Sequence, residues 1–127
     1  MALRVKGLQH LNLRVADLAR ARAFYETLGF EVSFAKGHTV WLSAGGDLLG
    51  LSEGEVAAER SGEHFGFIVD ERGDVDRWAA QLRARGVGAE KGPYDRSDGR
   101  SLYFRDPDGH LVEIFWLDPA FLALSRG

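Results

Sequence analysis

The sequence contains no cysteine, and this absence excludes several kinds of chemistry. Disulfide scaffolds, thiolate zinc sites and cysteine nucleophiles all require that residue. The chain also has no apolar run approaching the ~20 residues that cross a bilayer, and residues 1–6 contain no apolar signal core. We therefore expect a cytoplasmic protein that does not act on membranes.

An excess of positive charge is also missing. Lys and Arg number 16 against 19 Asp and Glu, which gives a formal net charge of −3. Nucleic acid binding through phosphates needs a basic face, so we expect no nucleic acid partner. What the chain does contain is 45% apolar residues over 127 residues, enough for the core of one domain spanning residues 1–127.

The first half of the chain predicts a strand, a helix and three further strands. Residues 8–15 alternate with the period of a strand, and Asp17 is placed to cap a helix whose apolar residues recur at helical spacing. Gly29 is placed to end that helix. The strand candidates that follow are residues 30–35, 38–43 and 48–52, and residues 53–63 are interpreted as a linker or a short helical turn.

The second half repeats this order of elements. Residues 64–69 alternate like the first strand, and Gly86 ends the helix that follows. Asp106-Pro107-Asp108-Gly109 is a strong hairpin turn signal. The remaining predictions are strands at 87–91, 101–105 and 111–116 and a short amphipathic tail helix at 118–127.

This internal repeat predicts an α+β fold of two βαβββ modules, at about residues 7–53 and 62–117. His10 and His64 occupy the same position in the two copies. A repeat this short favours two sheets related by a pseudo-twofold axis, with the function at the seam between them.

Glu113 lies within a strand of apolar residues, where an unpaired charge is costly. Two neutral imidazoles, His10 and His64, and this carboxylate make a suitable set of ligands for a divalent cation, with coordination positions left open for catalysis. The alternatives are histidines with structural hydrogen bonds and a glutamate paired with an arginine. The matched positions of the histidines favour the metal.

Three features of the chain resemble the vicinal-oxygen-chelate superfamily. They are the order of elements, the helix segment Ala21-Arg22-Ala23-Phe24-Tyr25-Glu26-Thr27-Leu28-Gly29-Phe30 and the segment Tyr103-Phe104-Arg105-Asp106-Pro107-Asp108-Gly109-His110-Leu111-Val112-Glu113. This superfamily includes glyoxalase I, extradiol dioxygenases, bleomycin-resistance proteins and fosfomycin-resistance enzymes. The resemblance covers residues 8–116. It implies paired βαβββ modules whose curved sheets form a cavity around a metal.

The ligand set distinguishes branches of this superfamily. Members similar to glyoxalase I have a second carboxylate ligand in the first module, but superposing the last strands places Glu113 on Gly50 here. The remaining set of His10, His64 and Glu113 resembles that of fosfomycin-resistance enzymes, and dioxygenases also use two histidines and a carboxylate. The metal implied is Mn²⁺, Fe²⁺, Ni²⁺ or Zn²⁺.

Residues 97–103, Ser-Asp-Gly-Arg-Ser-Leu-Tyr, resemble a loop of the fosfomycin-resistance branch. In thiol-transferring members that loop helps to bind K⁺, which implies Ser97, Gly99 and Ser101 as cofactor-binding residues. The tyrosine of the loop contacts the phosphonate, which implies a catalytic role for Tyr103. The alternative is a plain serine-glycine turn followed by a core tyrosine.

The chain departs from this branch at three places. The branch has a threonine two residues after the first histidine, where this chain has Asn12. The branch also has a phosphonate-binding arginine after the last ligand, and Leu122 falls near that position here. The basic residue that precedes the serine loop is either Lys91 or Arg96.

The resemblance implies a metal-dependent enzyme of fosfomycin-resistance type, a transferase or hydrolase that opens a small epoxide with glutathione, another thiol or water. One alternative is an extradiol-type dioxygenase on Fe²⁺ that uses Tyr103 or His38 as an acid or base. Another is a metal-free drug-binding resistance protein. The expected partners are a small-molecule substrate and a second copy of the chain in a homodimer.

Overall fold

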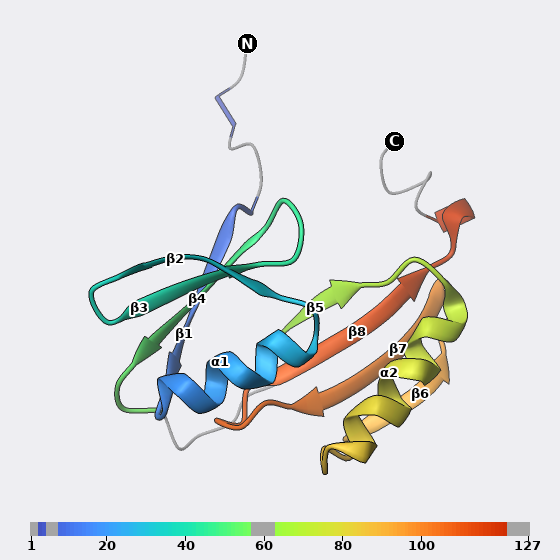
Figure 1. Ribbon diagram of the computed structural model, residues 1–127. Coiled ribbons are helices and arrows are strands. Elements are labelled where there is room, and N and C mark those ends of the chain that lie inside the picture. Colours follow the sequence, from blue (N-terminus) through green and yellow to red (C-terminus); the bar gives the residue numbers. More distant parts are fainter. Residues whose placement is uncertain (1–2, 5–7, 57–62, 122–127) are drawn as a thin grey trace. The chain divides into compact units, whose positions relative to one another are not determined.

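The computed structural model describes residues 3–4, 8–56 and 63–121. The chain divides into two compact units, residues 1–58 and 59–127 (Figure 1). Each unit contains a helix and a mixed four-stranded sheet in the order strand, helix, strand, strand, strand. This confirms the predicted α+β fold of two βαβββ modules.

The first unit has the sheet order β1-β4-β3-β2, in which β1 and β4 are parallel and the other pairs antiparallel. Its helix begins as predicted, since the Asp17 carboxylate accepts a hydrogen bond of 3.1 Å from the Arg20 amide. Gly29, with a φ of +101°, follows the helix end. The elements are β1 (His10–Val15), α1 (Leu18–Thr27), β2 (Glu31–Lys36), β3 (Thr39–Ser43) and β4 (Leu48–Glu53).

The two faces of the first sheet differ in character. One face is apolar and contributes Leu13, Val15, Leu42, Leu49 and Leu51 to the core, together with Ala21 and Tyr25 of α1. Strand alternation places His10, Asn12, Trp41 and Ser52 on the opposite face. These polar and aromatic side chains of the first unit therefore lie on the sheet face opposite its core.

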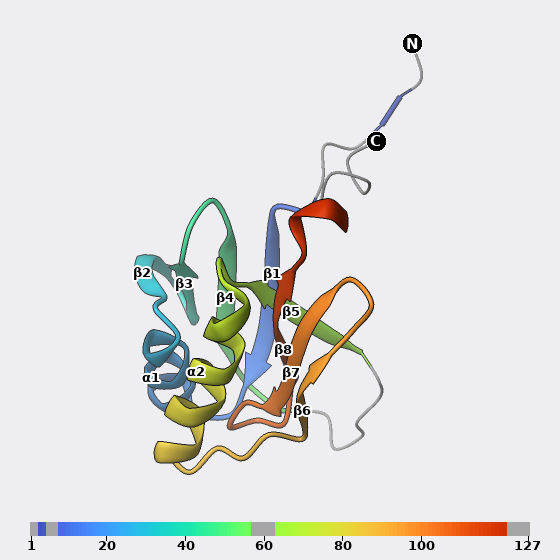
Figure 2. The ribbon, with the colours of Figure 1, turned by 90° about the vertical axis from the view of Figure 1, so that its right-hand side faces the viewer.

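The second unit repeats this arrangement with the sheet order β5-β8-β7-β6. Val75 and Leu82 of its helix are buried, as are Leu102, Phe104, Val112 and Ile114 of β7 and β8. Figures 1 and 2 show the helix along one face of the sheet. The elements are β5 (His64–Ile68), α2 (Arg72–Ala84), β6 (Lys91–Asp95), β7 (Gly99–Arg105) and β8 (Leu111–Leu117).

The strand predicted at residues 87–91 is wrong, because the pairing strand is β6, Lys91–Asp95. Pro93 lies within this strand, although proline cannot donate a hydrogen bond to a ladder. The segment is the edge strand of its sheet, where a missing donor costs little, and its register shifts between Lys91 and Tyr94.

The other predicted strands and both helices are confirmed to within a few residues. The linker at 53–63 lies partly, and the tail helix at 118–127 mostly, outside the described residues; residues 119–121 are helical. Within the part of the chain that is described, no helix has the length and apolar run that a bilayer span requires.

Candidate metal centre

The two sheets place their histidines at equivalent positions. His10 begins β1 and pairs with the first residue of β4, and His64 begins β5 and pairs with the first residue of β8. Two residues further along, β4 has Gly50 and β8 has Glu113. The register therefore supports the correspondence between Gly50 and Glu113, which leaves the first unit without a carboxylate at this position.

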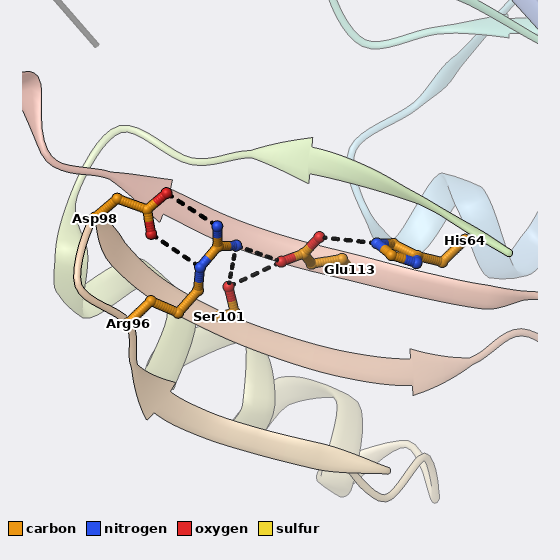
Figure 3. Close-up of polar contacts among 5 residues, drawn as sticks. All are labelled: His64, Arg96, Asp98, Ser101 and Glu113. Atoms are coloured by element: carbon orange, nitrogen blue, oxygen red, sulfur yellow. Dashed lines mark hydrogen bonds and ion pairs between the residues drawn. The ribbon is translucent and has the colours of Figure 1, made fainter. Parts of the chain in front are cut away.

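His64 and Glu113 come together in the second unit (Figure 3). The His64 Nε2 atom lies 3.4 Å from Glu113 Oε1, and the two side chains are 38% and 8% exposed. This separation is longer than an ordinary hydrogen bond. It matches the ~3.0–3.4 Å between neighbouring ligand atoms that each lie ~2.1 Å from one divalent ion. The pair therefore fits a metal in both donor chemistry and spacing.

The other oxygen of Glu113 is held by two partners. Oε2 accepts a hydrogen bond of 2.8 Å from Ser101 Oγ and one of 3.1 Å from Arg96 Nη1. The same Arg96 nitrogen donates to Ser101 Oγ at 3.1 Å. The alternative interpretation of Glu113, pairing with an arginine, thus holds for one oxygen, while the other oxygen faces His64.

The sequence left Arg96 as one of two candidates for the basic residue before the serine loop, and the structure places it at Glu113. Its Nε and Nη2 atoms bind the Asp98 carboxylate at 2.9 and 3.0 Å (Figure 3). Burial opposes the charged guanidinium, but the charges of Asp98 and Glu113 outweigh it and raise the pKa of Arg96 above its usual value. Arg96 is therefore a permanent cation between two carboxylates.

Tyr103 lies on β7 directly opposite Glu113 on β8. Its ring meets the His64 ring edge to face, with the centroids 5.3 Å apart. Burial and the negative charge of Glu113 raise the pKa of Tyr103 to about 12. The phenol therefore stays protonated, and able to donate a hydrogen bond, at neutral pH.

The three residues expected to bind K⁺ lie differently. Ser101 is fully buried and contacts Glu113, whereas Ser97 is exposed in the turn between β6 and β7. At Gly99, a Cβ atom would overlap the backbone oxygen of Trp116, so close approach of β8 explains this glycine without a ligand. Of the three, only Ser101 contacts the cluster around Glu113.

The face of the first sheet opposite its core carries His10 and a row of hydrogen-bonded polar side chains. The His10 ring lies edge to face with Trp41 at 5.4 Å, and its Nδ1 atom is 2.7 Å from Gln9 Oε1. Asn12 Nδ2 donates to Ser52 Oγ at 3.1 Å, and Ser52 is 2.7 Å from Thr39 Oγ1.

The space beside Gly50 is already filled. A Cβ atom there would come within 2.7 Å of both Trp41 and the Asn12 amide. At the position equivalent to Glu113, the first unit therefore has the Trp41 ring and the Asn12 amide where the second unit has a carboxylate. His10 remains its candidate ligand, and its joint action with His64 and Glu113 stays a prediction.

Comparison with known families identifies the family of this fold. The sequence model of the Glyoxalase/Bleomycin resistance protein/Dioxygenase superfamily matches residues 7–114, most of the chain. The chain belongs to this superfamily. Within the glyoxalase superfamily, the paired βαβββ modules observed here are the expected architecture, which confirms the predicted resemblance.

Several relatives in this superfamily are fosfomycin resistance proteins. The chain is 32% identical to the fosfomycin resistance protein FosX of Mesorhizobium japonicum, over 87% of this chain and 85% of that protein. It is 32% identical to the glutathione transferase FosA of Serratia marcescens, over 87% and 80%. The structure of FosX from Listeria monocytogenes matches with a TM-score of 0.82 at 28% identity, covering 98% of this chain and all of that one.

A second Listeria monocytogenes FosX structure, of a variant complexed with Mn(II) and 1S,2S-dihydroxypropylphosphonic acid, matches with a TM-score of 0.77 at 30% identity. It covers 87% of this chain and 90% of that one. The structural likeness thus extends to a relative that holds a divalent metal and a small phosphonate.

Proposed function

We propose that this protein is a divalent-metal-dependent enzyme that opens the epoxide ring of fosfomycin or a similar small phosphonate. The observation that carries the proposal is the His64–Glu113 pair, whose donor atoms lie 3.4 Å apart. The names of the relatives, among them FosX and FosA, support the substrate class.

The proposed ligands are His64, Glu113 and His10. His64 and Glu113 come from neighbouring parallel strands of one sheet, and His10 holds the equivalent position in the other unit. Because the ligands come from both modules, we propose that residues 1–127 act as one domain. A divalent ion bound by these residues would supply Lewis-acid polarisation of the oxygen atoms of the substrate.

Tyr103 is the proposed donor to the phosphonate. Its ring lies beside that of His64 and its strand position is opposite Glu113, and we infer from this that its hydroxyl group reaches a substrate oxygen near the metal. Its raised pKa, about 12, keeps the proton on the phenol, and a neutral donor can bind an anionic oxygen at physiological pH.

Asn12 is the proposed polar contact from the first unit. Its side chain shares a sheet face with His10, and its Nδ2 atom is fixed by the hydrogen bond to Ser52. Ser52 is in turn held by Thr39. An amide held in this way can offer its carbonyl oxygen to a hydroxyl or amine of a substrate or cosubstrate.

We propose a thiol or water as the nucleophile, and a thiol would come from outside the chain because the sequence contains no cysteine. A thiol or a water molecule forms a bond to an epoxide carbon, the carbon–oxygen bond of the ring breaks, and the proton of the nucleophile passes to the ring oxygen. Thiol addition makes the protein a transferase, and water addition makes it a hydrolase.

The proposal is tested by incubating the Mn²⁺-loaded protein with fosfomycin and following the products by ³¹P NMR. Parallel samples contain glutathione, cysteine or no thiol, and a sample with EDTA serves as the control. The expected result is a metal-dependent product in at least one sample. No product in any of them, with oxygen consumption on catechol by the Fe²⁺-loaded protein, would replace the proposal by the dioxygenase alternative.

A further inference from the structure

The turn between β6 and β7 already contains a cation. The resemblance assigns K⁺ to Ser97, Gly99 and Ser101, but the guanidinium of Arg96 contacts the buried oxygens of this segment. One nitrogen, Nη1, lies 3.1 Å from Ser101 Oγ and 3.1 Å from Glu113 Oε2 (Figure 3). These two oxygens are also hydrogen-bonded to each other, because Ser101 Oγ donates to Glu113 Oε2.

A metal ion at this place would meet the wrong partners. Hard cations bind oxygen atoms, whereas Arg96 presents N–H donors and a full positive charge. The remaining side of the guanidinium is bound to both oxygens of Asp98. The positive charge of Arg96 therefore stands between the two carboxylates, and an added K⁺ would be repelled by it. The residues present do not fit K⁺.

We propose that Arg96 is a built-in cation that replaces K⁺ in this hairpin, so that the protein binds its divalent metal without any monovalent ion. The proposal rests on the proposed metal site but not on the identity of the substrate.

Arg96 acts here as a positioning residue for Glu113. Together with Ser101 it fixes Oε2, and this leaves Oε1 directed at His64. A carboxylate held through one oxygen presents the other oxygen in a single orientation, and partners of this kind typically alter metal affinity by about 10–100-fold.

The test measures Mn²⁺ binding by calorimetry in choline chloride, NaCl and KCl at matched ionic strength. For the wild-type protein we expect the same Kd in all three salts, within about twofold. For Arg96→Ala we expect binding at least about tenfold weaker in choline chloride. KCl should restore part of this loss, because the deletion leaves Ser101, Glu113 and Asp98 without their cation.

Arg77→Ala is the matched control. Arg77 also binds two carboxylates, those of Asp74 and Glu71, but it does so on the exposed surface of α2. Its removal takes the same charge from the same unit and should leave Mn²⁺ affinity unchanged in every salt. Arg96→Lys keeps the charge without the guanidinium geometry, and it should bind Mn²⁺ independently of K⁺.

Two results would overturn the proposal: tighter Mn²⁺ binding by the wild-type protein in KCl only, or unchanged binding by a folded Arg96→Ala in all salts. The wild-type salt series decides the matter even when that variant does not fold. Where the wild-type protein binds no Mn²⁺ at all, the proposed function fails separately. Thermal unfolding of Arg96→Ala then decides, since a rise in Tm specific to K⁺ supports the built-in cation and no rise refutes it.

Discussion

At the scale of single residues, the surroundings of Glu113 compensate its buried charge and still leave one of its oxygens facing His64. One oxygen is hydrogen-bonded to Ser101 and Arg96, and the other faces His64. Its charge is therefore compensated on one side, and a donor atom remains available on the other. This division of roles can be examined through its uncharged member, Ser101.

Ser101→Ala should lower the free energy of unfolding by about 1.5–3 kcal/mol, because it removes a buried hydrogen bond to a charged group. Urea denaturation followed by circular dichroism measures the change. Ser97→Ala is the control, since Ser97 is exposed in the same hairpin and should change stability by less than about 0.5 kcal/mol. Equal stability of the two variants would contradict the buried role of Ser101.

Gly50→Ala should destabilise the first unit, because its Cβ atom would press on Trp41 and Asn12. Overpacking of this kind costs about 1–3 kcal/mol, and a shift of tryptophan emission should accompany it. In Gly45→Ala the new methyl group meets no atom within 4 Å, so stability should stay unchanged. A Gly50→Ala protein as stable as wild type would show that the space is not filled as described.

The sequence was sufficient to select Glu113, but it did not decide between Lys91 and Arg96 or link either residue to Glu113. A glutamate among apolar strand residues requires compensation wherever the strand is buried, and this requirement is visible in the sequence. Arg96 is separated from Glu113 by β7 and the turn that follows it, and no periodicity links the two residues. Only the register of β7 against β8 and the turn between β6 and β7 bring the two side chains together.

At the scale of elements, the edge strand β6 is held to its neighbours by a cluster of ion pairs among Arg72, Asp76, Asp95 and Arg100, called the clamp below. Arg100 of β7 binds Asp76 of α2 at 2.8 Å and Asp95 of β6 at 2.9 Å, and Arg72 of α2 binds Asp95 at 2.6 Å. Hydrogen bonds to Arg100 lower the pKa values of Asp76 and Asp95 below their usual range. The clamp joins three elements of the second unit.

These lowered pKa values predict how stability depends on acid. The unfolded carboxylates gain protons near pH 3.8 and the folded ones only at lower pH, so the contribution of the clamp is present above pH 3.8. It is lost as the pH falls through the lower folded values. Arg100→Ala should therefore lower the midpoint of thermal unfolding at pH 7 by a small amount, since its partners are half exposed and solvent screens the ion pairs.

Below the folded pKa values, wild type and Arg100→Ala should approach the same stability. Thermal unfolding between pH 7 and pH 2 measures this convergence. A difference between the two proteins that stays constant across this range would contradict the ionic origin of the clamp.

The sequence predicted most elements because their signals are local. Alternation predicted β1 and β5, and Asp17 and Gly29 marked the ends of α1 as observed. The failure at β6 has a non-local cause. Whether a segment containing Pro93 can be a strand depends on its place at the edge of a sheet, and only the pairing of β6 with β7 determines that place.

At the scale of the whole molecule, the two copies of the repeat differ at one position of the sheet face that carries the histidine. The second unit keeps a carboxylate at the position of Glu113, whereas the first has Gly50, with the space filled by Trp41. Both keep the histidine that begins the first strand of the sheet. The proposed function depends on a metal ion that these histidines and Glu113 bind together.

Calorimetric titration of Mn²⁺ tests whether these three residues bind one metal ion. The proteins compared are the wild type, His10→Ala, His64→Ala and Glu113→Gln, with His38→Ala as the control. His38 is exposed in the turn before β3 and should have no effect. We expect each of the three ligand variants to remain folded and to lose at least as much Mn²⁺ affinity as the loss of a residue that only positions a ligand, which is about 10–100-fold. Unchanged Mn²⁺ binding by folded His64→Ala would contradict this expectation.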